Sequence, residues 1–173
     1  PEEDRGLIDY LNFKNINAQA GHTIGDNIKN CVATTHHFNA MPSIHHRNKS
    51  IALTGLIDEN IYTEVIADLV HISEDTLKLI LKTKPSDKIL LISDSLPCAH
   101  YNQDIIFCNQ KINPLGLNEK GTLAGSNKTL DEICLNLINK NPNIRILSEV
   151  TMPVELCLLA RTTEIYSITG GLI

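Results

Sequence analysis

The stretch Tyr62–His71, with the sequence YTEVIADLVH, is an apolar, strand-like run that ends on a side chain able to bind a metal or move a proton. Three more runs end in the same way: Ile16–His22 (INAQAGH), Cys31–His36 (CVATTH) and Lys88–Asp94 (KILLISD). Helical patterns separate some of these runs. Parallel strands that alternate with helices bring the residues at their carboxyl ends together, as in the active sites of α/β barrels. The four runs therefore predict an α/β fold and a metal-assisted hydrolase.

A denser motif lies between the second and third runs. It reads Thr35-His36-His37-Phe38-Asn39-Ala40-Met41-Pro42 and continues to His45-His46-Arg47. This motif resembles the T-H-x-F-N-A-M-P…H-H-R signature of the N-acetylglucosamine-6-phosphate deacetylases, which belong to the amidohydrolase superfamily. Other pieces occur in the family's order: Gly21-His22 before the motif, then Glu64–His71 (EVIADLVH), Leu91–Asp94 (LISD) and Gly121–Ser126 (GTLAGS) after it.

The resemblance implies a fold class: the second half of a (β/α)8 TIM-type barrel. A complete barrel typically needs about 250 residues, whereas this chain has 173. We expect residues 1–160 to form an incomplete half of the amidohydrolase barrel, with Met152–Ala160 as its last helix. We expect residues 161–173 to supply the closing strand of a small flanking β domain. The family's H-x-H pair and its metal-binding Glu belong to the other half and are absent from this sequence.

The resemblance also assigns the chemistry. His22 and His36 match the family's two histidine metal ligands, and imidazole nitrogen suits zinc and also iron. Catalytic zinc normally takes three protein ligands, so a Glu from the other half is implied as the third. Asp94 matches the catalytic Asp, which takes a proton from the attacking water and passes it to the leaving amine. Without the motifs, the alternatives are core histidines satisfied by the backbone and an Asp in a turn.

Substrate-binding roles follow from the same resemblance. Arg47 matches a phosphate-binding arginine, because a guanidinium can bind phosphate bidentately; the alternative is a solvated loop arginine. His71 matches a histidine that contacts the sugar amide or a hydroxyl, and the alternative is a structural role. The remaining residues are Asn39 and Ala40, which would contact the phosphorylated sugar, and Leu123, Ala124 and Gly125, which would form the wall near the acetyl group. Gly125 has an equally good interpretation as a turn residue.

Three departures from the family pattern have structural consequences. His37 stands where the family has an apolar residue, so we expect its side chain to face the barrel exterior. Leu69 replaces the usual Gly before the substrate histidine, which would narrow the pocket. Ser95-Leu96 follow the catalytic Asp, where the family more often has Ala-Met. None of these changes removes a reactive group.

Composition excludes several classes of partner. The net charge is −5 and no basic run occurs, so we expect no nucleic acid partner. No apolar stretch approaches the roughly 18 residues that cross a bilayer, so no membrane partner is expected. The five cysteines form no CxxC pair and are odd in number. They indicate reduced thiols in a cytoplasmic protein, which we expect to be small buried hydrophobes. The resemblance further implies a homo-oligomer, a dimer.

The leading hypothesis is therefore a metal-dependent hydrolase that removes the acetyl group from N-acetylglucosamine 6-phosphate, with zinc or iron as the metal. A second hypothesis is an amidohydrolase for another N-acyl substrate. Arg47 argues against it, because an uncharged substrate would not need that cation. A third is a non-catalytic, inactive relative, which the missing Glu and H-x-H pair support.

Overall fold

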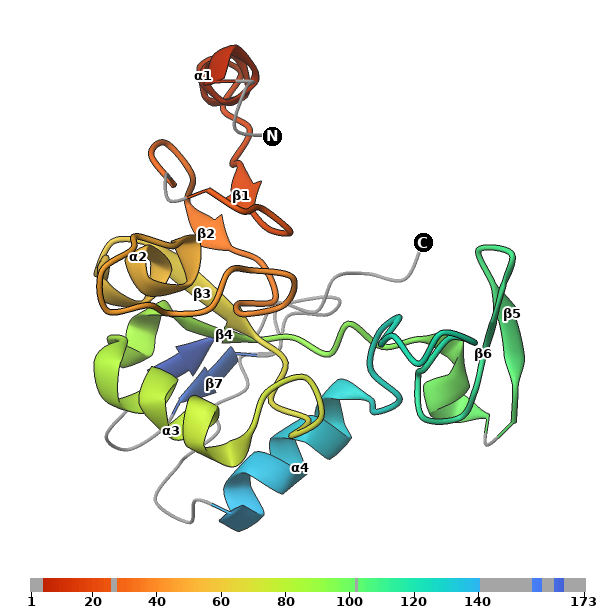
Figure 1. Ribbon diagram of the computed structural model, residues 1–173. Coiled ribbons are helices and arrows are strands. Elements are labelled where there is room, and N and C mark those ends of the chain that lie inside the picture. The colour runs from red at the N-terminus through yellow and green to blue at the C-terminus, as the bar shows by residue number, and fades with distance from the viewer. Residues whose placement is uncertain (1–4, 26–27, 102, 141–156, 160–163, 167–173) are drawn as a thin grey trace.

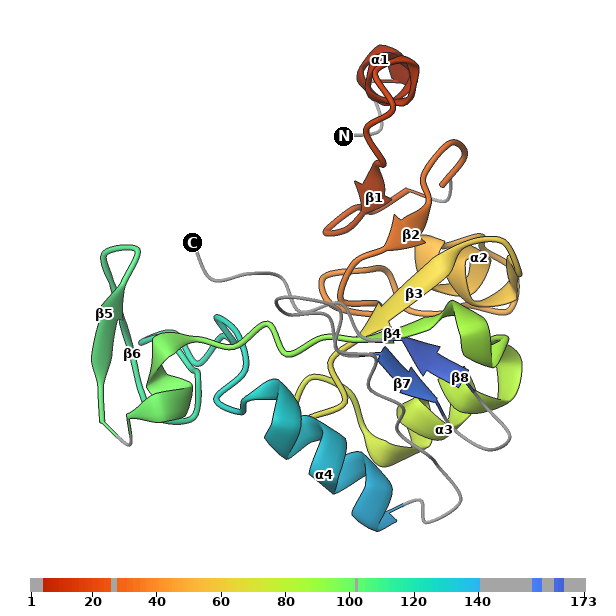
Figure 2. The ribbon, with the colours of Figure 1, turned by 180° about the vertical axis from the view of Figure 1, so that it is seen from behind.

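A mostly parallel sheet organises the chain, and its first four strands follow one another in sequence order. The computed structural model describes residues 5–25, 28–101, 103–140, 157–159 and 164–166. The sheet has six strands in the order β1-β2-β3-β4-β8-β7. The first four and β8 are parallel, and β7 pairs antiparallel with β8 (Figures 1 and 2). The strands are β1 (Gln19–Ala20), β2 (Ala33–Thr34), β3 (Tyr62–Val65), β4 (Ile89–Leu91), β7 (Cys157–Leu159) and β8 (Glu164–Tyr166).

Within the described residues, four α-helices accompany the sheet, and local capping fixes where several of them begin. The helices are α1 (Arg5–Phe13), α2 (Ile51–Ile57), α3 (Glu74–Thr83) and α4 (Leu130–Lys140). Ser73 caps α3, because its hydroxyl accepts the Thr76 N–H at 3.1 Å, as its position before an acidic first turn predicts. At the start of α4, the N–H and the hydroxyl of Thr129 both donate to Glu132 Oε2, at 2.8 and 3.1 Å; the first of these bonds is one half of a capping box.

One buried cluster joins three of the helices to the sheet. It contains Leu56 of α2, Leu77 and Ile80 of α3, and Ile133, Cys134 and Leu137 of α4, packed with Val65, Leu91 and their neighbours. Cys134 is therefore one of the buried cysteines that the composition predicts. These side chains pack against β3 and β4 and hold these two middle strands in place. The carboxyl ends of the parallel strands β1 to β4 lie at one edge of the sheet. This is the edge where the candidate site residues lie.

A second, two-stranded sheet stands apart from the first in both views (Figures 1 and 2). It is an antiparallel hairpin of β5 (Ile105–Phe107) and β6 (Gln110–Ile112). Two short 3-10 helices, η1 (Ser86–Lys88) and η2 (Pro97–His100), flank β4 in the sequence. The hairpin has its own small core of Leu96, Cys98 and Ile112. It projects from the segment between the fourth strand and α4.

Two expectations about the C-terminal part need comment. Met152–Ala160 was expected to be a helix, but Cys157–Leu159 is strand β7, so that expectation is wrong there; the rest of that segment lies outside the described residues. Glu164–Tyr166 is a strand, and it lies beside β4 in the main sheet. Most of residues 161–173 also lie outside the described part, and their assignment to a small β domain stays a prediction. No helix within the described residues is long and apolar enough to cross a membrane.

Candidate metal and substrate site

The two predicted metal ligands come together. His22 lies two residues after β1 and His36 two residues after β2, and their ring centroids are 4.6 Å apart with the planes tilted by 49°. Parallel pairing of β1 with β2 produces this approach, because it places the two strand ends side by side. His36 Nδ1 is buried and has no hydrogen-bond partner among the described residues. The predicted convergence of the rings is observed, and their role as metal ligands stays a prediction.

The backbone at these positions is strained. His22, His36 and Asp94 all have left-handed φ values, of 48°, 29° and 48°. Residues with a Cβ rarely adopt this region, and such strain concentrates at functional sites. Gly21 permits the approach of the two strand ends, since a Cβ on Gly21 would lie 2.1 Å from Thr35 Cγ2. Thr35 in turn donates its hydroxyl to Glu64 Oε2 at 2.6 Å, which ties the end of β2 to β3.

Asp94, the predicted catalytic residue, is exposed and lies three residues after β4. Its carbonyl oxygen accepts the Ser126 N–H at 2.8 Å, and Leu96 N–H donates to the Ser126 carbonyl at 2.9 Å. Gly125 allows this contact, because a Cβ there would lie 2.8 Å from the Asp94 carbonyl oxygen. Through the bond from the Ser126 N–H, the GTLAGS segment therefore fixes the backbone of Asp94, the predicted proton carrier.

A buried carboxylate lies at the end of β3. Asp68 is 1% exposed, and its Oδ1 accepts the N–H groups of Val70 and His71, both at 2.9 Å. Its Oδ2 accepts from His71 Nδ1 and from the Ser126 hydroxyl, both at 2.8 Å. Burial by itself raises the pKa of Asp68, but the hydrogen bonds from His71, Val70 and Ser126 outweigh it and lower the pKa to about 2. His71 is thus held by a permanently ionised partner.

His37 lies on the helix side of β2, as the sequence predicted, but it is not at the surface. It is 1% exposed, its Nε2 lies 3.0 Å from the Ala52 carbonyl oxygen of α2, and its Nδ1 lies 3.0 Å from Thr34 Oγ1. A carbonyl only accepts, so Nε2 carries the proton and the threonine hydroxyl donates to Nδ1. Burial lowers the pKa of His37 to about 4 against the opposing effect of the Ala52 bond, and the Lys84 charge adds to the lowering.

The predicted phosphate-binding loop runs from β2 to α2. Asn39 is half-buried, Ala40 is exposed with a φ of 50°, and Arg47 is exposed. The rings of His45 and His46 lie 4.4 Å apart, and Arg47 N–H donates to His45 Nδ1 at 3.2 Å. The loop therefore presents the guanidinium of Arg47 to solvent, while its contact with a phosphate stays a prediction.

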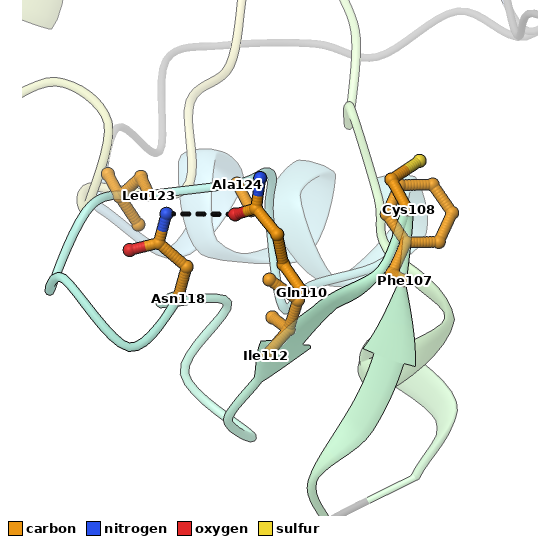
Figure 3. Close-up of a pocket in the computed structure, with 7 residues that line it drawn as sticks. All are labelled: Phe107, Cys108, Gln110, Ile112, Asn118, Leu123 and Ala124. Carbon is orange, nitrogen blue, oxygen red and sulfur yellow. Dashed lines mark hydrogen bonds between the residues drawn. The ribbon is translucent and has the colours of Figure 1, made fainter.

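Leu123 and Ala124, predicted to line the acetyl side, take part in a cavity of about 310 Å³ between the β5–β6 hairpin and the following loop. Figure 3 shows Gln110 and Asn118 facing each other across it, joined by a hydrogen bond of 3.1 Å. The other lining residues are Phe107, Cys108 and Ile112. Cys108 is exposed, unlike Cys31, Cys98 and Cys134, so the expectation of buried cysteines is wrong for this one.

Sequence reasoning missed Asp68 and Ser126. Both lie inside motifs that the sequence shows, EVIADLVH and GTLAGS. The spacing of Asp68 and His71, three residues apart beyond a strand, was the available signal. Nothing in the sequence pairs Asp68 with Ser126, 58 residues away. Leu69 has a φ of 63° and packs against the main core, so it occupies a glycine-like backbone position.

Comparisons with known proteins find deacetylases of phosphorylated amino sugars. The N-acetylglucosamine-6-phosphate deacetylase of Bacillus subtilis is 34% identical over 145 residues, which is 76% of this chain and 37% of that protein. An N-acetylgalactosamine-6-phosphate deacetylase of Escherichia coli is 25% identical over 151 residues, 80% of this chain and 40% of its own length. The crystal structure of the Thermotoga maritima N-acetylglucosamine-6-phosphate deacetylase matches with a TM-score of 0.70 and 28% identity, covering 79% of this chain and 41% of that one.

This chain is homologous to part of the N-acetylglucosamine-6-phosphate deacetylases. It spans about two fifths of the length of these deacetylases. The structure of the Pasteurella multocida deacetylase, with a TM-score of 0.70 and 24% identity, matches the same fold over 38% of its length. No model of a known protein family matches the chain. The deacetylase resemblance drawn from the motifs is therefore confirmed, and the α/β architecture with it.

Proposed function

We propose that this chain supplies one half of the active site of a metal-dependent hydrolase that removes the acetyl group from N-acetylglucosamine 6-phosphate. The products would be glucosamine 6-phosphate and acetate. The observation that carries the proposal is the convergence of His22 and His36 at the ends of two neighbouring parallel strands. The 34% identical relative supports the substrate. A Mycobacterium smegmatis deacetylase of the same fold has been seen in complex with N-acetyl-D-glucosamine-6-phosphate.

The residues present fit a divalent metal ion, zinc in the first place and iron as the alternative. A buried imidazole nitrogen without a partner costs roughly 1–3 kcal/mol, and His36 Nδ1 is such an atom, beside a second imidazole. A cation between the rings would satisfy it. The described residues hold no group of three metal-binding side chains, so the proposal requires a further ligand from the other half of the barrel. When bound, the metal would polarise the acetyl carbonyl and acidify the attacking water.

Asp94 would move the proton. It lies at the same edge of the sheet as His22 and His36, because β1 to β4 are parallel. As a carboxylate it would accept a proton from the attacking water and then donate it to the nitrogen of the leaving amine. The braced carbonyl of Asp94 fixes the backbone from which this side chain extends. His71 would contact the sugar amide or a hydroxyl, with Leu123, Ala124 and Gly125 on the acetyl side.

Arg47, with Asn39 and Ala40, would bind the phosphate. Arg47→Ala should weaken binding of glucosamine 6-phosphate by about 2 kcal/mol, the value of a charged hydrogen-bond partner, and leave glucosamine unaffected. Lys49→Ala is the matched control, since Lys49 is an exposed cation of the same loop. Calorimetric titration with both sugars would measure the difference. Equal losses with the two sugars would show that Arg47 does not recognise phosphate.

A second substrate has specific support. Two relatives, 25% and 27% identical, are named as N-acetylgalactosamine-6-phosphate deacetylases, the second putatively. The two sugars differ only in the orientation of one hydroxyl, and the loop around Arg47 would treat their phosphates alike. Parallel measurement of acetate release from the two phosphorylated sugars would rank them, and the 34% identical relative favours the glucosamine derivative.

Metal binding tests the proposal most directly. We expect Zn²⁺ or Co²⁺ to bind the chain, and His22→Ala and His36→Ala to abolish binding in calorimetry. The control is His45→Ala, which replaces an exposed histidine outside the pair. It should bind the metal ion as tightly as the wild type does. Acetate release should then require the same metal. Equal metal affinity in all three variants would contradict the assignment of the two ligands.

A further inference from the structure

The Asp68–His71 pair carries an inference that rests on the proposed function and deepens it. His71 Nδ1 lies 2.8 Å from Asp68 Oδ2, and the two side chains are only 4% and 1% exposed. An ionised carboxylate offers no proton, so Nδ1 must carry the hydrogen in this contact. The other ring nitrogen, Nε2, has no hydrogen-bond partner in the part of the chain that the structure describes.

We propose that Asp68 is a positioning residue that fixes the tautomer of His71, so that neutral His71 presents the lone pair of Nε2 to a hydrogen-bond donor of the substrate. That donor is an N–H or O–H group of the amino sugar. The second nitrogen of a histidine takes its state from the bond that the first one makes. His71 therefore accepts a hydrogen bond from the sugar. Asp68, which does not touch the sugar, determines which nitrogen of His71 carries the hydrogen.

The carboxylate itself has no freedom to turn. Its Oδ1 is fixed by the N–H groups of Val70 and His71, and its Oδ2 is shared by His71 Nδ1 and the Ser126 hydroxyl. Lys128 Nζ donates to the Asp68 carbonyl oxygen at 3.1 Å, which adds a positive charge at the backbone of the same residue. The two carboxylate oxygens of Asp68 thus accept four hydrogen bonds, from two backbone N–H groups, one imidazole and one hydroxyl. Each of these four donors would need another acceptor if the carboxylate turned.

Ser126 connects this pair to the proposed proton carrier. Its hydroxyl donates to Asp68 Oδ2, while its N–H donates to the Asp94 carbonyl oxygen. One residue thus sets the distance between the end of β3, which carries His71, and the end of β4, which carries Asp94. The substrate contact and the proton-carrying group are positioned together.

The test exploits a property of the amide side chain. In Asp68→Asn one oxygen becomes an NH₂ group, which can donate but not accept. The two backbone N–H groups can only donate, so the amide oxygen must remain with them and the NH₂ group must face His71 Nδ1. Two donors cannot share a bond, and we expect His71 to move its proton to Nε2. The lone pair offered to the sugar is then lost.

Nitrogen-15 NMR of histidine-labelled protein reads the tautomer directly, at a pH where the imidazoles are neutral. We expect wild-type His71 to show a protonated Nδ1 and an unprotonated Nε2, and Asp68→Asn to show the reverse. Ser126→Ala keeps the carboxylate and should keep the wild-type tautomer, as should Asp75→Asn, which alters an Asp whose side chain is 95% exposed. A wild-type spectrum with a protonated Nε2 overturns the inference, even if Asp68→Asn fails to fold.

Titration with N-acetylglucosamine 6-phosphate separates this inference from the proposed function. We expect the sugar to shift the Nε2 signal of the wild type and to bind Asp68→Asn on the order of tenfold more weakly, the value of one net hydrogen bond. If the tautomers are as expected but no protein binds the sugar, the result would support the positioning role of Asp68 and contradict the proposed substrate. Undiminished binding by a variant whose tautomer has switched would overturn the acceptor role of Nε2.

Discussion

Three residues with left-handed backbones mark the ends of three strands: His22, His36 and Asp94. For a residue with a Cβ this conformation costs roughly 1–2 kcal/mol, and it persists because packing and hydrogen bonds around each position hold it. The braced Asp94 carbonyl is one such constraint. Strain at these three positions, which the motifs also single out, is typical of residues held for function rather than for stability.

Gly21 is the residue on which the approach of His22 and His36 depends. Gly21→Ala would place a methyl group 2.1 Å from Thr35 Cγ2, so the ends of β1 and β2 must move apart. We expect the free energy of unfolding to fall by about 1–3 kcal/mol, as for other overpacked positions, and metal affinity to fall with it. Urea unfolding and Zn²⁺ titration would measure the two effects.

Gly121→Ala is the control for backbone conformation. Gly121 has a positive φ, of 74°, and a Cβ added to it would meet no atom within 4 Å. The variant should therefore lose stability through backbone strain alone and keep the metal affinity of the wild type. Wild-type metal affinity in Gly21→Ala as well would contradict the steric argument.

Asp94 tests the proton-transfer step. In a preparation that releases acetate from N-acetylglucosamine 6-phosphate, Asp94→Asn should lower turnover by roughly 10²–10⁴-fold, because asparagine keeps the shape but cannot carry the proton. Metal content and sugar affinity should change little. Asp87→Asn, which alters an exposed Asp of η1, should behave as the wild type. Turnover within a few-fold of the wild type at equal metal content would leave Asp94 as a turn residue.

At the scale of elements, the sequence predicted best where local signals and packing agree. The caps of α3 and α4 and the positions of β1 to β4 were predictable, although the strands are shorter than the apolar runs. Helix α2 was missed, because Ile51–Ile57 contains Gly55 and follows a long polar loop. No helix occurs among the described residues between His22 and His36, where Ile28 packs into a small cluster with Ile51 and Ile61.

Gly55 and Lys84 explain why α2 is stable without a strong local signal. A Cβ on Gly55 would lie 2.9 Å from His37 Cε1, so glycine lets the helix sit against β2. Lys84, which is 4% exposed, donates its Nζ to the carbonyl oxygen of Gly55 at 2.7 Å and also to that of Asp58. These bonds satisfy carbonyls at the end of α2 that the helix itself leaves open. The stabilising contact comes from a residue 29 positions away, which local patterns cannot reveal.

Lys84→Met should therefore destabilise α2 and the loop before it. The methionine fills similar space but removes the ammonium from two carbonyl groups. The Gly55 carbonyl then keeps only the Thr63 hydroxyl, and the Asp58 carbonyl only the Ile61 N–H, each at 3.4 Å. We expect a loss of roughly 1–3 kcal/mol if no water replaces the ammonium. Urea unfolding of Lys84→Met against Lys82→Met, which alters an exposed lysine of α3, isolates the effect of the buried contact. Equal stability of the two variants would mean that water satisfies these carbonyls in the folded protein.

At the scale of the whole molecule, the sequence predicted the order of β1 to β4 and the convergence of His22 and His36, because the motifs that end these strands follow one another along the chain. The sequence did not predict the contacts that join the GTLAGS segment to the ends of β3 and β4. That link runs through Ser126, whose hydroxyl and N–H contact residues 58 and 32 positions earlier. Tertiary contacts of this kind depend on how the chain returns to the sheet, and a single sequence carries no pattern for them.

The stability of the whole molecule should depend on pH through His37. Its pKa is lowered from 6.5 to about 4 in the folded protein, chiefly by burial. Between these values the unfolded chain binds a proton that the folded chain refuses, so stability is complete above pH 6.5 and falls as the pH drops toward 4. At about 1.4 kcal/mol per pH unit, protonation of His37 should lower the free energy of unfolding by roughly 2 kcal/mol between pH 6.5 and pH 5.

Urea unfolding at pH 7 and pH 5 would measure this loss in the wild type and in two variants. His37→Gln can hydrogen-bond to Ala52 without titrating, so it should show a correspondingly smaller loss, whereas His45→Gln, at an exposed position, should match the wild type. An equal loss in His37→Gln and the wild type would assign the pH dependence to other groups.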